Sequence, residues 1–174
     1  LAHPLFDVPH EVTRDAGSTF AVSEYRSGRT LAGLLGRDAA GGWPLRSVLP
    51  VGHRIAEGLA HAHAVGLVHG ALDLASVLLT ADDDVVVLDL GLRAALQAGR
   101  ADPRDDVLGL ARIILALLTG ACPGHAAGAM PERPAGLREA AWAGLLQGLA
   151  SDPALRPVSG EALMVSLEDP GWFR

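Results

Sequence analysis

Lysine and asparagine are absent from this 174-residue sequence, and cysteine and aromatic residues are scarce. All 14 basic residues are arginines, so any site that needs a lysine amine or an asparagine amide cannot be built from this chain alone. The single cysteine, Cys122, excludes an internal disulfide and fits a reducing compartment. No apolar run reaches the roughly 18 residues of a membrane span. We therefore expect no transmembrane helix and a cytoplasmic location.

The overall balance of the sequence favours one globular domain that does not bind nucleic acid. Hydrophobic residues make up 49% of the chain and the formal net charge is −6. A nucleic-acid binder needs a basic face, which an acidic chain does not supply. The sequence begins at Leu1 without a methionine or a secretion signal, so we expect it to be part of a longer chain.

Apolar periodicity and capping residues predict a mainly helical chain with a few short strands. Two strands joined by a turn at 14–18 are expected near the start, at Leu5–Val8 with a continuation to Val12 and at Thr19–Tyr25. Thr30, Asp102 and Ser159 are predicted to cap helices. Pro50 should kink or restart the second helix, because it removes a backbone donor. The predicted helices cover 31–36, 44–63, 102–120, 137–150 and 159–167, and 121–136 is expected to be a loop.

The most informative stretch, 61–92, joins a helix end to a polar loop and two apolar strands. The loop is His69-Gly70-Ala71-Leu72-Asp73-Leu74-Ala75-Ser76, and strands are expected at Val77–Thr80 and Val85–Leu88. Asp89-Leu90-Gly91 follows the second strand. Phosphoryl transfer requires a carboxylate that accepts a proton and oxygen ligands for Mg²⁺. The polar loop and Asp89 are the parts of this stretch that would supply such a carboxylate and such oxygen ligands.

Three further motifs occur in order around this stretch. The first is E-Y-x-x-G-x-T-L at Glu24–Leu31, which links the predicted hairpin to the first helix. The second is the nearly all-apolar helix Asp106–Gly120, a pattern typical of a central buried helix. The third is the turn D-P-x-x-R-P-x-S at Asp152–Ser159.

Together these motifs resemble the C-terminal lobe of the protein kinase family, of the bacterial serine/threonine type, in a degenerate or pseudokinase form. The resemblance implies a mainly α (α+β) fold: a kinase-like C-lobe with a short N-terminal β-hairpin left from the N-lobe. It also implies a division into residues 1–28, the remnant N-lobe strands and hinge, and residues 29–174, the helical C-lobe. The two parts are expected to form one compact domain.

The same resemblance assigns positions within the loop. Ala71 stands where the family has its proton-accepting Asp, Asp73 where it has a Lys, and Ser76 where it has a metal-binding Asn. His69 and Gly70 complete this degenerate loop. Asp89, with Gly91, matches the family's metal-binding D-F-G motif, so Asp89 is at most a vestigial metal ligand. We therefore expect no catalytic residue and, apart from this vestigial Asp89, no cofactor or metal site.

The resemblance implies structural roles for three residues, His69, Asp106 and Arg156. Asp106 matches a buried family Asp that accepts hydrogen bonds from the loop backbone near His69. A cap on the helix surface is the alternative role for Asp106. Arg156 normally pairs with the Glu of an A-P-E motif that this sequence lacks. We expect Arg156 to pair instead with Asp102 or Asp105.

Three histidines near the loop raise the alternative of a zinc site. His61 and His63 are two residues apart, about 200° around a helix, so they cannot chelate one metal together. We therefore disfavour a zinc cluster formed with His69.

The sequence predicts a chain that is not an enzyme and that binds another protein as a scaffold or regulatory module. The alternatives are residual nucleotide binding, with weak or no phosphotransfer through Asp73 or Asp89, and a structural remnant without a ligand. Small-molecule phosphotransferases also carry H-G-D in this loop, but Ala71 removes the same Asp. No nucleic-acid or membrane partner is expected, and ATP and Mg²⁺ are expected to bind at most weakly.

Overall fold

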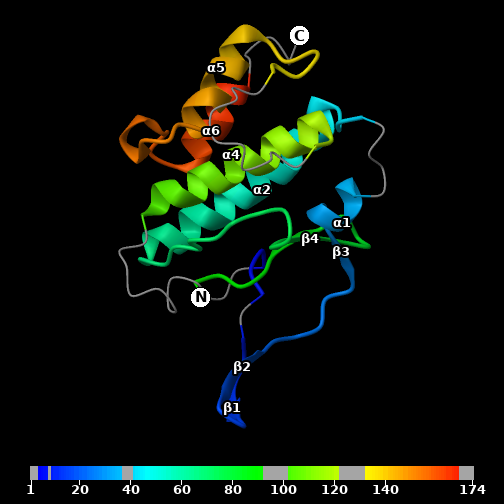
Figure 1. The fold of residues 1–174 in the computed structure, drawn as a ribbon, viewed down its shortest axis with the longest axis vertical. Helices are drawn as coiled ribbons and strands as arrows, with labels where there is room; N and C mark the ends of the chain where they lie inside the picture. Colours follow the sequence, from blue (N-terminus) through cyan, green and yellow to red (C-terminus); the bar gives the residue numbers. More distant parts are fainter. Residues whose placement is uncertain (1–3, 8, 37–40, 92–101, 122–131, 169–174) are drawn as a thin grey trace.

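The helices of the computed structural model gather at one end of the molecule, away from a protruding hairpin (Figure 1). The structure describes residues 4–7, 9–36, 41–91, 102–121 and 132–168. Residues 92–101 and Cys122 lie outside these described residues. The helices are α1 (Leu31–Leu35), α2 (Leu45–Ala64), α4 (Pro103–Thr119), α5 (Glu139–Gly148) and α6 (Gly160–Leu167), with a 3-10 turn, η1, at Pro153–Leu155.

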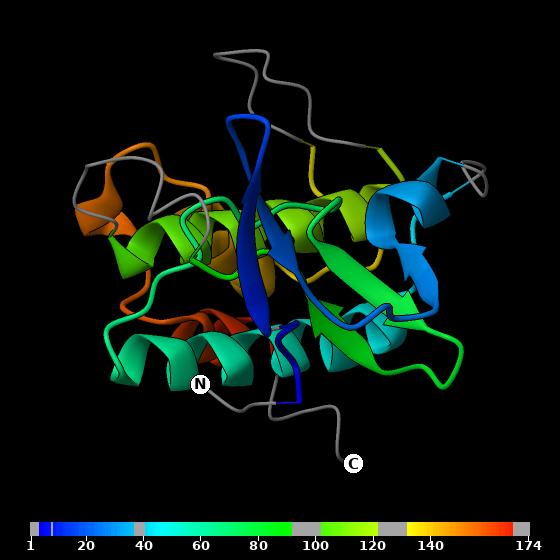
Figure 2. The same cartoon turned by 90° about the horizontal axis from the view of Figure 1, so that it is seen from below.

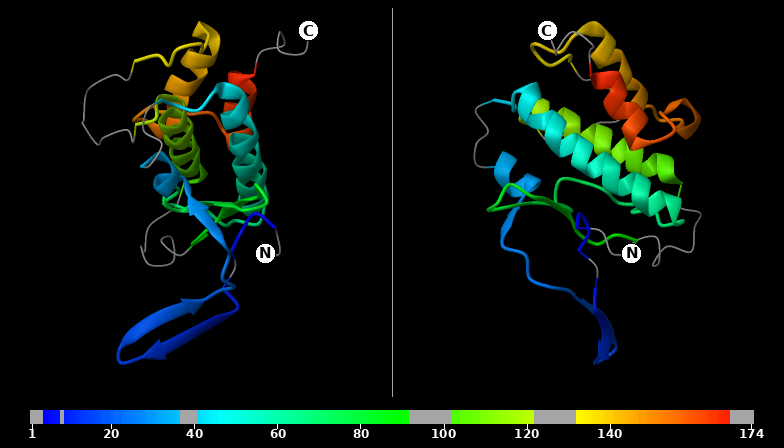
Figure 3. Two further views of the ribbon diagram at one scale, coloured as in Figure 1. Left: turned by 90° about the vertical axis from the view of Figure 1, so that its right-hand side faces the viewer. Right: turned by 180° about the vertical axis from the view of Figure 1, so that it is seen from behind.

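Helices α2 and α4 run side by side in opposite directions and carry α5 and α6 on one side (Figures 1 and 3). Helix α4 is buried nearly all round, as its apolar sequence predicts, and Arg112 is its one exposed residue between Leu110 and Leu117. Leu110, Ile114 and Leu117 are almost fully buried. The prediction of a central buried helix is confirmed.

The predicted helix caps are present. The side chain of Thr30 accepts from the N–H of Gly33, that of Asp102 from Arg104, and that of Ser159 from Ala162. Each cap satisfies a backbone donor that the first turn of a helix leaves unpaired. Gly120 ends α4 with φ +72°, a conformation that favours glycine.

A small antiparallel sheet lies between the helices and the hairpin (Figures 1 and 3). Its strand order is β3-β4-β5, from β3 (Gly28–Thr30), β4 (Val77–Thr80) and β5 (Val85–Val87). Val77 and Val87 face each other in the register, and both are fully buried. The strands predicted around the polar loop are therefore confirmed.

Strands β1 (Glu11–Asp15) and β2 (Ser18–Val22) form a separate two-stranded hairpin that projects from the body (Figure 3). Its two-residue turn, Ala16-Gly17, has φ +46° and +83°, which suits the right-handed twist of a tight hairpin. Val12, Phe20 and Val22 are exposed on it. The predicted turn at 14–18 is confirmed.

Three local predictions need correction. Residues 5–7 do not form a strand; Phe6 makes only an isolated parallel bridge to Val87. Helix α2 does not restart at Pro50, because buried residues on both sides of it, Val48 and Val51, hold one continuous helix against the core. Strand β3 was not predicted, since Gly28-Arg29-Thr30 has no apolar alternation and is ordered by its pairing with β4.

The described residues contain no helix long and apolar enough to cross a membrane.

Candidate functional site

The candidate site is the loop that connects α2 to β4, residues 65–76, which lies against the first half of α4 (Figures 1 and 2). Two turns that favour glycine shape its first half, at Gly66 (φ +77°) and Gly70 (φ +74°). Gly109 on α4 allows the close approach. A Cβ at that position would lie 2.5 Å from the carbonyl oxygen of Leu72.

Asp106 on α4 anchors the first half of the loop. Its carboxylate accepts the N–H of His69 at 2.9 Å and the N–H of Gly70 at 2.8 Å, and the residue is 0% exposed. The predicted contact is confirmed, and the surface-cap alternative for Asp106 is wrong. A buried carboxylate is tolerated because its acceptor sites are filled by donors.

His63 is a third partner of Asp106 that the sequence analysis did not identify. Its Nε2 lies 2.8 Å from Oδ2 of Asp106, and its side chain is 13% exposed. His63 is on the last turn of α2, six residues before His69. The signal for this role was the position of His63 on the turn that leads into the loop.

His69 links the loop to the end of β5. Its Nε2 lies 2.9 Å from the carbonyl oxygen of Leu88, and its Nδ1 accepts the N–H of Ala71 at 3.3 Å. These partners require the tautomer with the proton on Nε2, because a carbonyl oxygen can only accept. The ring is 1% exposed, so His69 has a structural task in the loop.

Asp73 and Ser76 close the second half of the loop on itself. Oδ1 of Asp73 accepts the N–H of Ala75 at 2.8 Å and the N–H of Ser76 at 2.9 Å. The hydroxyl of Ser76 donates to the carbonyl oxygen of Asp73 and accepts its N–H, both at 2.9 Å. This is the local turn that Asp and Ser side chains favour. Ala71, half-buried between the two halves, contributes only a methyl group.

Asp89 follows β5 in a backbone conformation that is uncommon for residues other than glycine. Its φ is +59° and Gly91 has φ +72°. Asp89 is exposed, and within the described part of the chain its carboxylate has no hydrogen bond or ion pair. The bond from Leu88 N–H to the carbonyl oxygen of Ser76, 2.8 Å, keeps this turn beside the loop.

Arg156 joins the turn after α5 to the beginning of α4. Its guanidinium donates to Oδ1 of Asp105 at 2.8 Å and to the carbonyl oxygens of Arg104, Ala150 and Ser151 at 2.8–3.2 Å. The Arg156 side chain is 5% exposed and that of Asp105 is 50% exposed. The predicted pairing with Asp105 is confirmed, and Asp102 instead caps α4.

The three histidines do not come together as a metal site. His63 contacts Asp106, His69 contacts Leu88, and His61 is exposed on α2. No group of three or more metal-ligating side chains is found among the residues that the structure describes. Asp73 in the loop and Asp89 after β5 carry exposed carboxylates, the kind of oxygen ligand that Mg²⁺ prefers.

Comparisons with known proteins point to one family, although no family model matches the chain. The serine/threonine-protein kinase PknL of Mycobacterium tuberculosis is 32% identical over 133 residues, which cover 63% of this chain and 33% of PknL. The serine/threonine-protein kinase drp72 of Corynebacterium efficiens is 37% identical over 87 residues, 49% of this chain and 16% of drp72. The chain thus spans a third or less of these relatives.

Solved structures show the fold. The crystal structure of the Mycobacterium tuberculosis PknI kinase domain superposes with a TM-score of 0.80 at 24% identity, covering 96% of this chain and 72% of that domain. Another crystal structure of the same domain superposes with a TM-score of 0.77, over the same shares of both chains. The predicted kinase-like fold is confirmed.

These relatives contradict the prediction that the chain is not an enzyme, because PknL and drp72 are both named as serine/threonine-protein kinases. That prediction rested on groups missing from this sequence, including the Asp replaced by Ala71. The chain spans only about a third of PknL. A group that is missing from this chain therefore does not show that a longer protein would lack it.

The sequence similarity to PknL and the match to the PknI kinase domain lead to one conclusion. The chain is a homologue of the bacterial serine/threonine protein kinases and has the helical lobe of the protein kinase fold with a few N-terminal strands.

Proposed function

We propose that this chain is a regulatory module that binds another protein through the surface of its kinase-like lobe. The observation that carries the proposal is that the polar side chains of the loop are engaged in hydrogen bonds within the protein. Asp106, His69 and Ser76 are at least nine-tenths buried and hydrogen-bonded within the protein, and Asp73 bonds to its own turn. These groups hold the loop in shape and leave few of its polar atoms for a ligand.

The surface supports the same proposal. Val12, Phe20 and Tyr25 are 50–89% exposed in the hairpin and the segment that follows it. Phe20 and Val22, two residues apart on β2, lie on the same face of the hairpin, and neighbouring exposed apolar side chains are typical of interaction surfaces. The partner we propose is a protein, because a net charge of −6 disfavours nucleic acid.

Nucleotide binding at Asp89 is a second candidate, which one observation favours. Asp89 combines an exposed carboxylate with a left-handed backbone, and such conformations cluster at functional sites. One carboxylate beside the neutral Ser76 gives a Mg²⁺–phosphate group few anionic partners, so the affinity should be low. The kinase names of the relatives are in line with this candidate.

A thermal-shift titration with Mg²⁺–ATP separates the two candidates. The regulatory proposal predicts a melting temperature that does not change as Mg²⁺–ATP is added. A saturable increase in melting temperature that Asp89→Ala abolishes would contradict it and support nucleotide binding. Asp15→Asn, an exposed acid at the tip of the hairpin, is the matched control and should behave as the parent protein does.

A further inference from the structure

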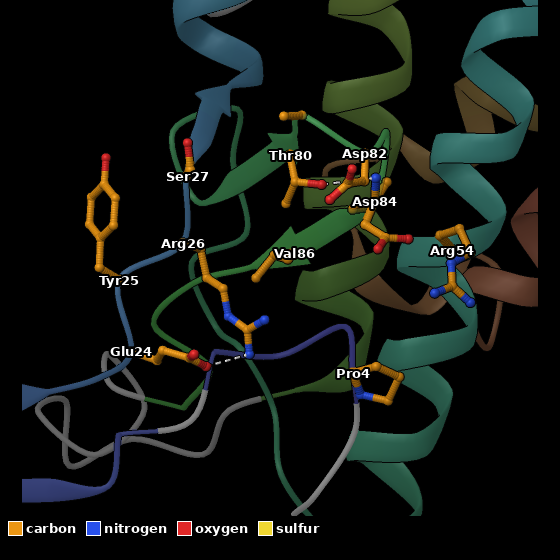
Figure 4. Close-up of a pocket in the computed structure, with 12 residues that line it drawn as sticks. Pro4, Glu24, Tyr25, Arg26, Ser27, Arg54, Thr80, Asp82, Asp84 and Val86 are labelled. Atoms are coloured by element: carbon orange, nitrogen blue, oxygen red, sulfur yellow. Dashed lines mark hydrogen bonds and ion pairs between the residues drawn. The ribbon is translucent and has the colours of Figure 1, made fainter.

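A groove of about 400 Å³ lies behind the segment that connects the hairpin to β3 (Figure 4). Residues 24–27 form one wall, Arg54 of α2 lies at another, and the turn between β4 and β5 closes it. The groove is on neither the polar loop nor Asp89. It is therefore a separate surface of the same lobe.

The charges that line the groove do not balance. Arg26 pairs with Glu24 at 2.9 Å, and Arg54 pairs with Glu57 at 3.5 Å. In the part of the chain that the structure describes, the carboxylates of Asp82 and Asp84 have no hydrogen-bonding or ionic partner.

The turn between β4 and β5, residues 80–84, is here called the acidic turn, and it is closed by hydrogen bonds of its own. The N–H of Asp84 donates to Oγ1 of Thr80 at 3.1 Å, and Thr80 N–H donates to the carbonyl oxygen of Asp84 at 2.9 Å. Asp83, between Asp82 and Asp84, has φ +61°. The carboxylates of Asp82 and Asp84 are thus presented from a closed turn, which lowers the entropy cost of binding a cation there.

An aromatic residue stands at the rim of the groove. The residue Tyr25 is 89% exposed, and Figure 4 shows its ring pointing away from the body. Pro4, Val85 and Val86 supply apolar surface within the groove. A ligand that fits this groove carries positive charge for the acidic turn. It also carries either an apolar side chain for the groove or an arginine that stacks on the ring of Tyr25.

We infer that this groove binds a basic, extended segment of a partner protein, with two cationic side chains placed on Asp82 and Asp84. The inference rests on the proposed function and names the surface and the chemistry of its partner. A divalent cation is the other occupant that two carboxylates suggest. The described residues hold no group of three metal ligands, so the peptide is favoured.

The test measures the affinity of a labelled ten-residue peptide for the intact protein by fluorescence anisotropy. The peptide carries two arginines, one on each side of a leucine. The same peptide with glutamates in place of the arginines is the charge control. Asp82→Asn and Asp84→Asn should each weaken binding about three-fold, and together about ten-fold, as expected for exposed ion pairs. Tyr25→Ala should weaken it by a similar factor of about three.

The matched control removes two negative charges elsewhere. Glu11→Gln with Asp15→Asn changes two exposed acids of the hairpin by the same total charge, and peptide affinity should stay within about two-fold of the parent. An equal loss in this control would show a non-specific charge effect and overturn the inference. Calorimetric binding of Mg²⁺ alone that the Asp82 and Asp84 substitutions abolish would overturn it too.

The outcomes separate this inference from the proposed function. If the arginine peptide does not bind but Mg²⁺–ATP leaves the melting temperature unchanged, the groove assignment is wrong and the regulatory proposal stands. If the peptide binds through Asp82 and Asp84 while Mg²⁺–ATP stabilises the protein through Asp89, the groove stands and the regulatory proposal fails.

Discussion

Asp106 and Asp73 each accept two backbone N–H groups from the same loop, yet one is buried and the other is exposed. Asp106 holds His69 and Gly70 at 2.9 and 2.8 Å, and Asp73 holds Ala75 and Ser76 at 2.8 and 2.9 Å. The bonds are alike in length, and Asp106 is 0% exposed. Burial therefore decides how much each carboxylate stabilises the loop, because water can replace the bonds of Asp73 only.

The comparison also shows how the loop is organised. Its first half is held by Asp106 on α4, 36 and 37 residues away in sequence, and Asp106 also contacts His63 at the end of α2. Its second half is held by a turn of four residues that makes its own hydrogen bonds. We therefore expect the two halves to respond separately to substitution.

Asp106→Ala should have the largest effect of the substitutions considered. It leaves the N–H groups of His69 and Gly70 and the ring of His63 without their acceptor in a buried place. The loss in unfolding free energy should be about 3–5 kcal/mol, measured by urea denaturation. A loss below about 1 kcal/mol would contradict the anchoring role of Asp106.

Arg156→Ala should follow, with a loss of about 2–4 kcal/mol, because three carbonyl oxygens lose a charged donor. Asp105→Ala is the matched control. Asp105 is half exposed, so its removal should cost no more than about 1 kcal/mol. Equal losses would mean that the ion pair, and not the carbonyl contacts, carries the stability. Arg156→Lys should restore only part of the loss, since an ammonium cannot reproduce the guanidinium fork.

Gly109→Ala should cost about 1–3 kcal/mol, because the added methyl group meets the backbone of Leu72. Gly33→Ala is the comparison in a helix where the added carbon meets only the Thr30 hydroxyl at 3.3 Å. Thermal unfolding of the two variants should separate them. A Gly109→Ala protein as stable as the parent would show that α4 can move away from the loop.

Asp73→Ala should cost only about 1 kcal/mol, although it removes as many backbone hydrogen bonds as Asp106→Ala. The measurement is the same urea denaturation. A loss as large as that of Asp106→Ala would break the comparison between the two carboxylates, because burial would then not be the deciding factor.

Much of this architecture was predictable because it depends on local signals. The caps at Thr30, Asp102 and Ser159 follow from side chains that accept from the N–H two or three positions on. The contacts of Asp106 and Arg156 followed from the family resemblance. The carbonyl partners of Arg156 did not follow from it, since backbone groups carry no sequence signal.

The remainder depended on residues that are distant in the chain. Strand β3 forms because β4 lies beside it, and α2 passes Pro50 because its buried neighbours hold it. The groove joins residues 24–27, Arg54 and the β4–β5 turn, which have no spacing in common. The prediction that the chain is not an enzyme rested on groups missing from its sequence, and the kinase relatives contradict it.

Hydrogen exchange of single amides, followed by NMR, tests most directly the claim that Asp106 organises the first half of the loop. The account predicts that Asp106→Asn lowers the protection of the His69 and Gly70 amides by a factor on the order of 10², while the Ala75 and Ser76 amides keep theirs. Asp73→Ala should do the reverse. Loss of protection in all four amides of the Asp106→Asn protein, or in none of them, would contradict the account.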